Sequence, residues 1–103
     1  MCEKYTKDGK TAILVSRGYG AGWSTWEGRE LAYDKRVVEK YLAGISENEM
    51  KEYLNSIGYE DVYMGGYSQI QVVWLTVGTM FRIKEYDGCE SLELADDIDW
   101  IVA

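Results

Sequence analysis

An apolar run of β-forming residues predicts a strand in the first part of the chain, and alternation of apolar and polar residues with a period of two predicts strands in the last part. Thr11–Ser16 is rich in β-formers and almost wholly apolar, as expected of a central strand. Asp8-Gly9 before it favours a tight hairpin turn, so residues 1–9 are expected to be partly flexible or to form a short hairpin strand. From Gln69 on, strands are predicted over residues 69–75, 79–86, 89–94 and 98–102.

The middle of the chain has the period of helices instead. Asp34 is a plausible N-cap for a first helix, which Gly44 ends by a left-handed cap. Ser46 and Glu49 form a capping box for a second helix, which Gly58 ends. The apolar stripes are Val37, Val38, Tyr41 and Leu42 in the first helix, and Met50, Tyr53, Leu54 and Ile57 in the second. Two short helices so closely joined predict a helical hairpin.

The register of the last hairpin follows from its turn. Asp87-Gly88 favours a two-residue turn that pairs Tyr86 with Cys89. Stepping back along the strands places Phe81, Ile83, Leu92 and Leu94 on one apolar face, and Arg82 opposite Glu93 on the other. The chain is therefore predicted to be a single α+β domain over residues 1–103, with a mainly antiparallel sheet and an α-helical hairpin packed on one face.

Composition excludes several classes of protein. The sequence has no histidine, which removes Ser-His-Asp and Cys-His catalysis and histidine metal sites. Apolar runs reach only four residues, so no membrane span or secretory signal is expected. Cys2 and Cys89 are predicted to be free thiols in a reducing cytoplasm.

Charge is distributed unevenly along the chain. The net charge is −7, with +2 on residues 1–40 and −9 on residues 41–103. The acidic half repels phosphate backbones, so direct nucleic-acid binding is not expected. It either keeps the protein soluble or attracts a basic protein surface.

Residues 17–26 (RGYGAGWSTW) form the most unusual segment, and they are predicted to be a loop. The glycine spacing matches neither a dinucleotide-binding fingerprint nor a P-loop. Two interpretations remain open. Backbone N–H groups beside Trp23 and Trp26 can stack a purine and bind its phosphates, or both tryptophans pack in the core around a tight chain crossing.

Catalysis has weaker support. The loop hydroxyls lack a histidine base, and no S-x-x-K pair occurs. Glu85 and Glu90 face each other in the predicted register, which is compatible with a two-carboxylate site but favours a solvated strand end. The chain is therefore predicted not to be an enzyme, and to need no metal or cofactor.

One resemblance covers nearly the whole chain. The string Gly18-Tyr19-Gly20-Ala21-Gly22-Trp23-Ser24-Thr25-Trp26, followed by Gly65-Gly66 and by Gly78–Gly88, resembles a family of small acidic phage and prophage proteins. Proteins of this kind often act against host defences, as inhibitors of defence enzymes or as sponges for cyclic-nucleotide signals. The resemblance implies an anti-defence role of the same sort, in the cytoplasm of a bacterial host cell.

Two hypotheses for function follow. The first is non-enzymatic sequestration of a small nucleotide-like ligand by the loop. The second is an acidic inhibitor that contacts a host defence protein, of the CRISPR-inhibitor type, as a nucleic-acid mimic. A homo-oligomer is expected because fourteen aromatic residues exceed what so small an interior holds. The predicted ligand-binding residues are Arg17, Gly18, Tyr19, Gly20, Gly22, Trp23, Ser24, Thr25, Trp26, Arg82 and Tyr86.

Overall fold

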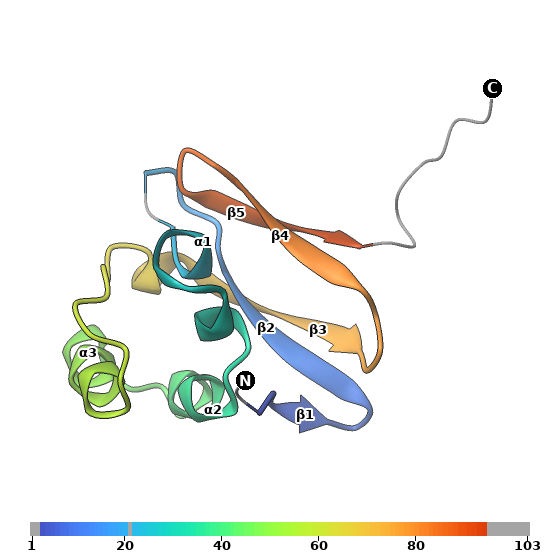
Figure 1. Cartoon of the computed structure of the whole chain (residues 1–103), viewed down its shortest axis with the longest axis horizontal. Helices are drawn as coiled ribbons and strands as arrows, with labels where there is room; N and C mark the ends of the chain where they lie inside the picture. Colours follow the sequence, from blue (N-terminus) through green and yellow to red (C-terminus); the bar gives the residue numbers. More distant parts are fainter. Residues whose placement is uncertain (1–2, 21, 95–103) are drawn as a thin grey trace.

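The computed structural model describes residues 3–20 and 22–94, without the side chains of Trp26, Glu27 and Arg29. The chain has an α+β fold with antiparallel strands in two sheets (Figure 1). Its elements are, in order, β1 (Thr6–Lys7), β2 (Lys10–Ser16), α1 (Ser24–Glu27), η1 (Arg29–Ala32), α2 (Lys35–Leu42), α3 (Glu47–Ser56), η2 (Tyr67–Gln69), β3 (Ile70–Thr76), β4 (Phe81–Tyr86) and β5 (Cys89–Leu94).

Strand β2 is the centre of the first sheet, whose order is β1-β2-β3. The predicted hairpin at Asp8-Gly9 is confirmed, since both residues have positive φ and Lys7 pairs with Lys10. On its other side β2 pairs with β3 along its full length, from Lys10 opposite Thr76 to Ser16 opposite Ile70.

The helical hairpin is also confirmed, and its caps lie where the sequence places them. The Asp34 side chain accepts a hydrogen bond from Arg36 N, which caps α2. Ser46 Oγ accepts one from Glu49 N, which caps α3. Gly44 between the helices has a φ of 79°, a left-handed conformation that favours glycine.

The second sheet is the hairpin β4–β5, and its predicted register is correct at every pair. Arg82 binds Glu93 through two hydrogen bonds of 2.9 Å on the outer face. The predicted α+β class is confirmed, and its antiparallel strands are divided between two sheets because β4 does not continue the sheet of β3. After Gly78, whose φ is 92°, the hairpin crosses to the other face of the first sheet, where its apolar side is partly buried.

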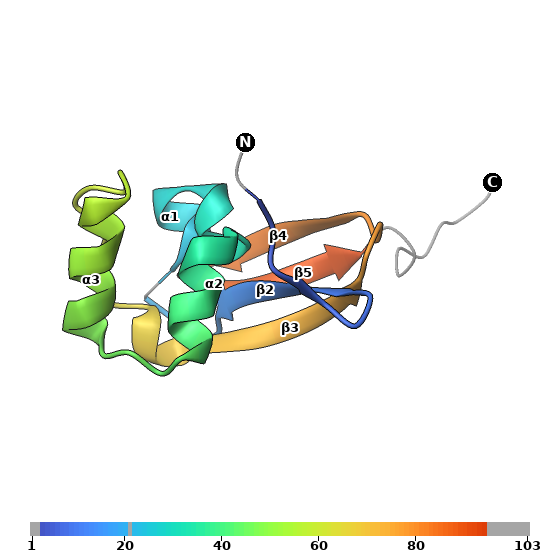
Figure 2. The ribbon, with the colours of Figure 1, turned by 90° about the horizontal axis from the view of Figure 1, so that it is seen from below.

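Two hydrophobic clusters explain why β2 is apolar on both faces. Ala12 and Leu14 pack toward the helices, whereas Ile13 and Val15 pack toward the hairpin. Figures 1 and 2 show the helices α2 and α3 gathered on one side of β2 and the hairpin on the other. A strand covered on both faces needs such a continuous apolar run.

Three segments differ from the sequence prediction. The loop over residues 17–26 ends in a short helix, α1. It is followed by the 3₁₀ turn η1, for which the sequence pattern predicts no element. Gln69 belongs to η2 rather than to a strand, and β4 begins at Phe81 rather than Thr79. The predicted strand over residues 98–102 lies outside the described residues.

Candidate functional site

The Gly-aromatic loop, residues 17–26, folds around the carboxylate of Glu90. Glu90 is fully buried although it lies on a two-stranded hairpin. Its Oε1 accepts a hydrogen bond from Ser16 N at 2.8 Å. Its Oε2 accepts hydrogen bonds from Trp23 N at 2.8 Å, Thr25 N at 3.0 Å and Thr25 Oγ1 at 2.5 Å. We call these four donors the Glu90 cradle.

The cradle changes the interpretation of the loop. Backbone N–H groups that the sequence offered to a ligand phosphate bind a carboxylate of the same chain instead. The expectation of a solvated strand end is wrong for Glu90, because the loop removes it from water. Its opposite residue, Glu85, is exposed and accepts a hydrogen bond from Gly88 N at 2.8 Å.

Two glycines of the loop are required by its path. A Cβ atom at Gly18 would lie 2.5 Å from Cγ of Gln69. The loop therefore passes too close to η2 at this point for residue 18 to carry a side chain. Gly20 has a φ of 75°, and its N–H donates to the Asp87 carbonyl in the β4–β5 turn. Gly18 thus allows the close approach to Gln69 in η2, and Gly20 allows the contact with the β4–β5 turn.

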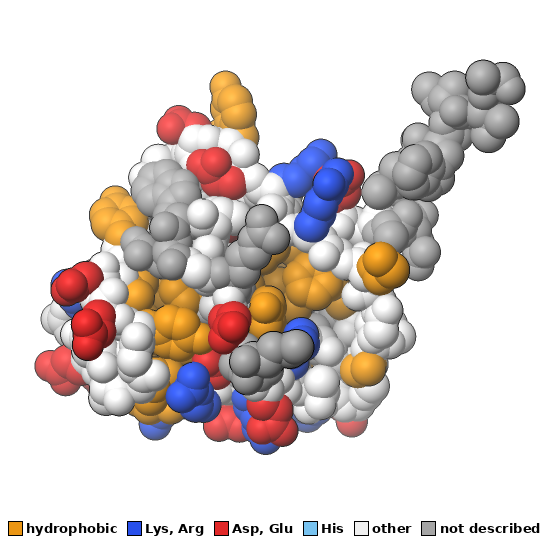
Figure 3. All heavy atoms as spheres, in the orientation of Figure 1, with side chains coloured by type: hydrophobic (Ala, Val, Ile, Leu, Met, Phe, Trp, Pro, Cys, Tyr) orange, Lys and Arg blue, Asp and Glu red, His pale blue; other side chains and the backbone are white. Residues whose placement is uncertain are grey.

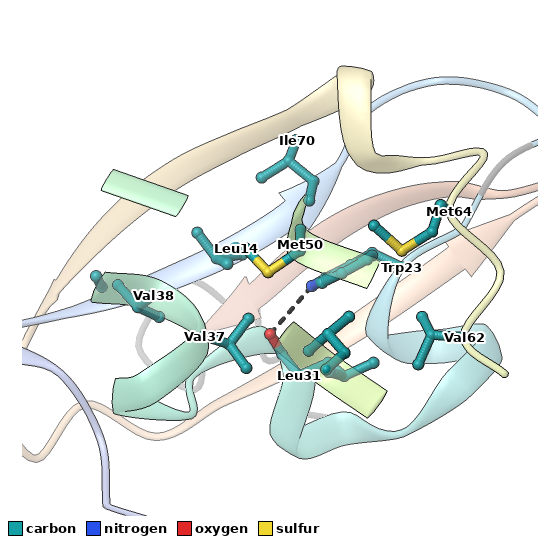
Figure 4. Packing of buried hydrophobic residues seen from close by; sticks show 11 residues of the cluster. Leu14, Trp23, Leu31, Val37, Val38, Met50, Val62, Met64 and Ile70 are labelled. Carbon is teal, nitrogen blue, oxygen red and sulfur yellow. Dashed lines mark hydrogen bonds between the residues drawn. The ribbon is translucent and has the colours of Figure 1, made fainter. Parts of the chain in front are cut away.

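Trp23 belongs to the core. It is fully buried, and its Nε1 donates to the Leu31 carbonyl at 3.0 Å. Figure 4 shows the indole among Leu31, Met50 and Met64, with that hydrogen bond dashed. The ring has no face open to a ligand in this conformation, which favours the core interpretation for this tryptophan.

Other predicted residues of the loop divide between the interior and the surface. Ser24 is buried and its Oγ has no hydrogen-bond partner. Gly22 is buried too, whereas Arg17 is exposed and its guanidinium donates to the Glu90 carbonyl at 3.4 Å. The side chain of Trp26 lies outside the description.

Thr25 and Arg82 come together at a cleft between the α1–η1 region and the hairpin. The cleft has a volume of about 470 Å³ and is lined by Lys4, Thr25, Tyr33, Phe81, Arg82, Ile83 and Glu85. Aromatic surface, a hydroxyl and two cations thus converge on one hollow. Lys4, Tyr33 and Glu85 were not predicted as ligand residues, since only the folded chain brings residues 4, 33 and 85 together.

The cations of this cleft already have partners. Lys4 Nζ lies 4.9 Å from the centre of the Tyr33 ring, a cation–π distance. Arg82 and Lys84 both bind Glu93, and hydrogen bonds from Arg82 are the main cause that lowers the pKa of this carboxyl. Figure 3 shows Lys and Arg side chains gathered over the hairpin β4–β5.

Tyr19 and Tyr86 form a separate aromatic pair at the tip of the hairpin. Their ring centres are 6.4 Å apart in an edge-to-face arrangement, and the residues are 71% and 76% exposed. They border a shallow hollow of about 500 Å³ together with Lys84, Glu85, Cys89 and Ser91. The predicted ligand residues are therefore distributed over a buried group, a cleft and an exposed tip.

A third polar centre lies at Asp34, which is almost completely buried. Burial raises the pKa of its carboxyl, but hydrogen bonds from Arg36 and from the Tyr59 hydroxyl outweigh burial and lower the pKa below its usual 3.8. The Asp34 backbone also forms an isolated antiparallel β-bridge with Lys4, so the N-cap of α2 is joined to a residue that lines the cleft. Its role is structural.

In the part of the chain that the structure describes, no three metal-ligating side chains gather into a group. Within residues 3–20 and 22–94, no helix has the length and apolar character needed to cross a membrane. Comparison of the chain with protein-family models, curated proteins and solved structures returns no match. The resemblance to small phage proteins therefore stays a prediction.

Proposed function

We propose that the protein is a non-enzymatic binding protein that takes a small nucleotide-like ligand in the cleft lined by Lys4, Thr25, Tyr33, Phe81 and Arg82. The observation that carries the proposal is the meeting of two aromatic rings, a hydroxyl and two cations in one hollow. Rings stack a base, and cations bind its phosphates. A volume of about 470 Å³ falls within the range of roughly 300–1,000 Å³ that is typical of small-molecule sites.

The proposed ligand site is the cleft and not the Gly-aromatic loop that the sequence predicts. Glu90 fills the backbone cradle, so a phosphate gains nothing from those N–H groups. Thr25 is the link between the two, because it binds Glu90 and also lines the cleft. Sequestration of a defence signal is the role that the resemblance to phage proteins implies for such a binder.

Native mass spectrometry of the full chain, purified from phage-infected cells, tests whether it carries a ligand. Calorimetry then measures affinity for a panel of nucleoside mono-, di- and triphosphates and cyclic dinucleotides. We expect Lys4→Glu and Arg82→Gln to weaken binding at least tenfold, and Lys7→Glu, on the exposed strand β1 outside the cleft, to leave it unchanged. Equal losses in Lys4→Glu and Lys7→Glu, or no binding by any member of the panel, would contradict the proposal.

A second candidate is a protein-interaction inhibitor that uses the Tyr19–Tyr86 pair. Two exposed tyrosines in contact are typical of the aromatic anchors at protein interfaces. The nucleic-acid-mimic form of this idea has less support, since Glu90 is buried and Glu93 is bound by Arg82 and Lys84. The double variant Tyr19→Ala/Tyr86→Ala separates the candidates: it should abolish partner inhibition and retain nucleotide binding.

A further inference from the structure

The outer edge of β3 is open to another strand. Among the described residues, β3 pairs with β2 alone. Arg17 N donates to the Gln69 carbonyl and Val77 N to the Gly9 carbonyl, which sets the direction of the backbone groups between them. By the alternation of an antiparallel ladder, Gln71, Val73 and Leu75 direct their N–H and C=O groups toward β2. Those of Ile70, Val72, Trp74 and Thr76 point outward.

The two ends of this edge are partly covered, and its middle is not. The Tyr41 hydroxyl of α2 donates to the Ile70 carbonyl at 2.9 Å, on the outward side. At the other end, Thr79 N donates to the Thr76 carbonyl at 3.0 Å. Between them, the N–H and C=O groups of Val72 and Trp74 and the N–H of Thr76 have no strand beside them in the described chain. A row of unpaired donors and acceptors is a template for strand pairing.

The other outer strands are protected against such pairing, and β3 is not. β1 is only two residues long and ends in Lys7. In the two-stranded sheet, β4 carries Arg82, Lys84 and Glu85, and β5 carries Glu90 and Glu93. β3 has seven residues (IQVVWLT) with neither charge nor proline. Short edges and edge charges are the usual means of preventing association, and this edge has neither.

We propose that β3 pairs antiparallel with β3 of a second copy of this chain, forming a two-fold symmetric dimer with a continuous six-stranded sheet. The ladder fixes the register, because outward-directed residues must face each other. The two-fold axis passes between the two copies of Trp74, and Val72 faces Thr76 of the second copy. This inference does not depend on the ligand proposed above.

A second copy fits this edge for reasons of charge and shape. The molecule has a net charge of −7, so association is favoured where neither copy presents charge, and β3 is such a segment. A strand that meets itself about a two-fold axis makes an isologous interface. Trp74 is 39% exposed and would gain an aromatic cross-strand neighbour.

Sedimentation of the full chain at ~100 µM, together with amide hydrogen exchange, tests the proposal at concentrations well above a micromolar Kd. We expect a dimer mass. The amides of Val72, Trp74 and Thr76 should become protected as concentration rises, whereas those of Gln71, Val73 and Leu75 stay protected throughout. A monomer would overturn the proposal. This holds even if its Val72, Trp74 and Thr76 amides are protected, because another part of the same chain would then cover the β3 edge. A dimer whose outward amides stay exposed would also overturn it, because its interface lies elsewhere.

Charge at the axis provides a matched set of variants. Trp74→Lys and Trp74→Glu should each be monomeric at that concentration, and an equimolar mixture should recover dimers. Met80→Lys is the control, because Met80 is 74% exposed and lies beyond the strand. Thr76→Pro removes one outward N–H without altering the β2–β3 ladder, and should weaken the dimer while circular dichroism is retained. Dimers that persist in folded Trp74→Lys would disprove the register.

Discussion

The Thr25 hydroxyl donates a 2.5 Å hydrogen bond to the carboxylate of Glu90, which joins the start of α1 to β5 across 65 positions of the chain. The same carboxylate accepts hydrogen bonds from the N–H groups of Ser16 and Trp23. A buried charge is costly unless its acceptors are filled, and here both oxygens are bound. Glu90 is therefore the ligand that orders the Gly-aromatic loop.

Replacing Glu90 tests this role. Glu90→Gln keeps the shape but turns an amide N–H₂ toward backbone donors, so we expect a loss of roughly 3 kcal/mol in the free energy of unfolding, since hydrogen bonds to charged groups contribute about 1.5–3 kcal/mol each. Urea unfolding measures it. Glu85→Gln, directly across the hairpin but exposed, is the control and should cost less than ~1 kcal/mol. Equal stability of Glu90→Gln and the parent chain would contradict the structural role.

Shortening the same side chain offers a complementary test. Glu90→Ala leaves the N–H groups of Ser16, Trp23 and Thr25 without their acceptor. Sodium acetate should raise the melting temperature of this variant in a saturable way and should have no such effect on the parent chain, because its own carboxylate fills the cradle. Chloride at equal ionic strength controls for screening.

Trp23 and Ser24 separate the core from the site interpretation of the loop. Trp23→Ala should lower the free energy of unfolding by ~3–5 kcal/mol, as expected for a large buried aromatic residue. Ser24→Ala should be neutral or stabilising by up to ~1 kcal/mol, because it removes a buried hydroxyl that has no partner. Urea unfolding and ligand binding are measured on both variants. Ligand binding lost in Ser24→Ala at full stability would favour the site interpretation.

The hairpin register predicts opposite results at neighbouring positions. Ile83→Asp places a charge in the cluster that includes Ile13, Val15 and Leu75, and it should unfold the protein at 25 °C. Lys84→Asp lies on the outer face, where the side chain is 61% exposed, and its effect should be limited to the loss of the bridge to Glu93. Circular dichroism compares the two variants. A folded Ile83→Asp would argue against the packing of the hairpin on β2.

Asp34 makes stability depend on acid pH. Its pKa is lower in the folded protein than the usual 3.8, so the stability that it contributes is present above that value and is lost as pH falls through the folded pKa. Tyr59→Phe removes the 2.7 Å hydrogen bond to this carboxylate. We expect it to lower the melting temperature clearly at pH 7 and by less at pH 2.5. A difference between parent and variant that does not change with pH would contradict the assignment.

The sequence by itself determined the local structure of this protein. Asp8-Gly9 and Asp87-Gly88 specify their turns by conformations available to few residues, and alternation around the second turn fixes every pair of β4–β5. Asp34, Ser46 and Gly44 bound the two helices through contacts within a few residues. These interactions are short in sequence, so their signal is contained in a short window.

Only the tertiary structure decided which residues share a site. Glu90 looked like a solvated acid, because the donors that bury it lie 65 to 74 positions away. Separation along the chain likewise conceals most of the partners of Trp23 in the core and the meeting of Lys4, Tyr33 and Arg82 at the cleft. The hairpin leaves the sheet of β3 because its apolar face must be buried, and the second face of β2 is where that burial occurs.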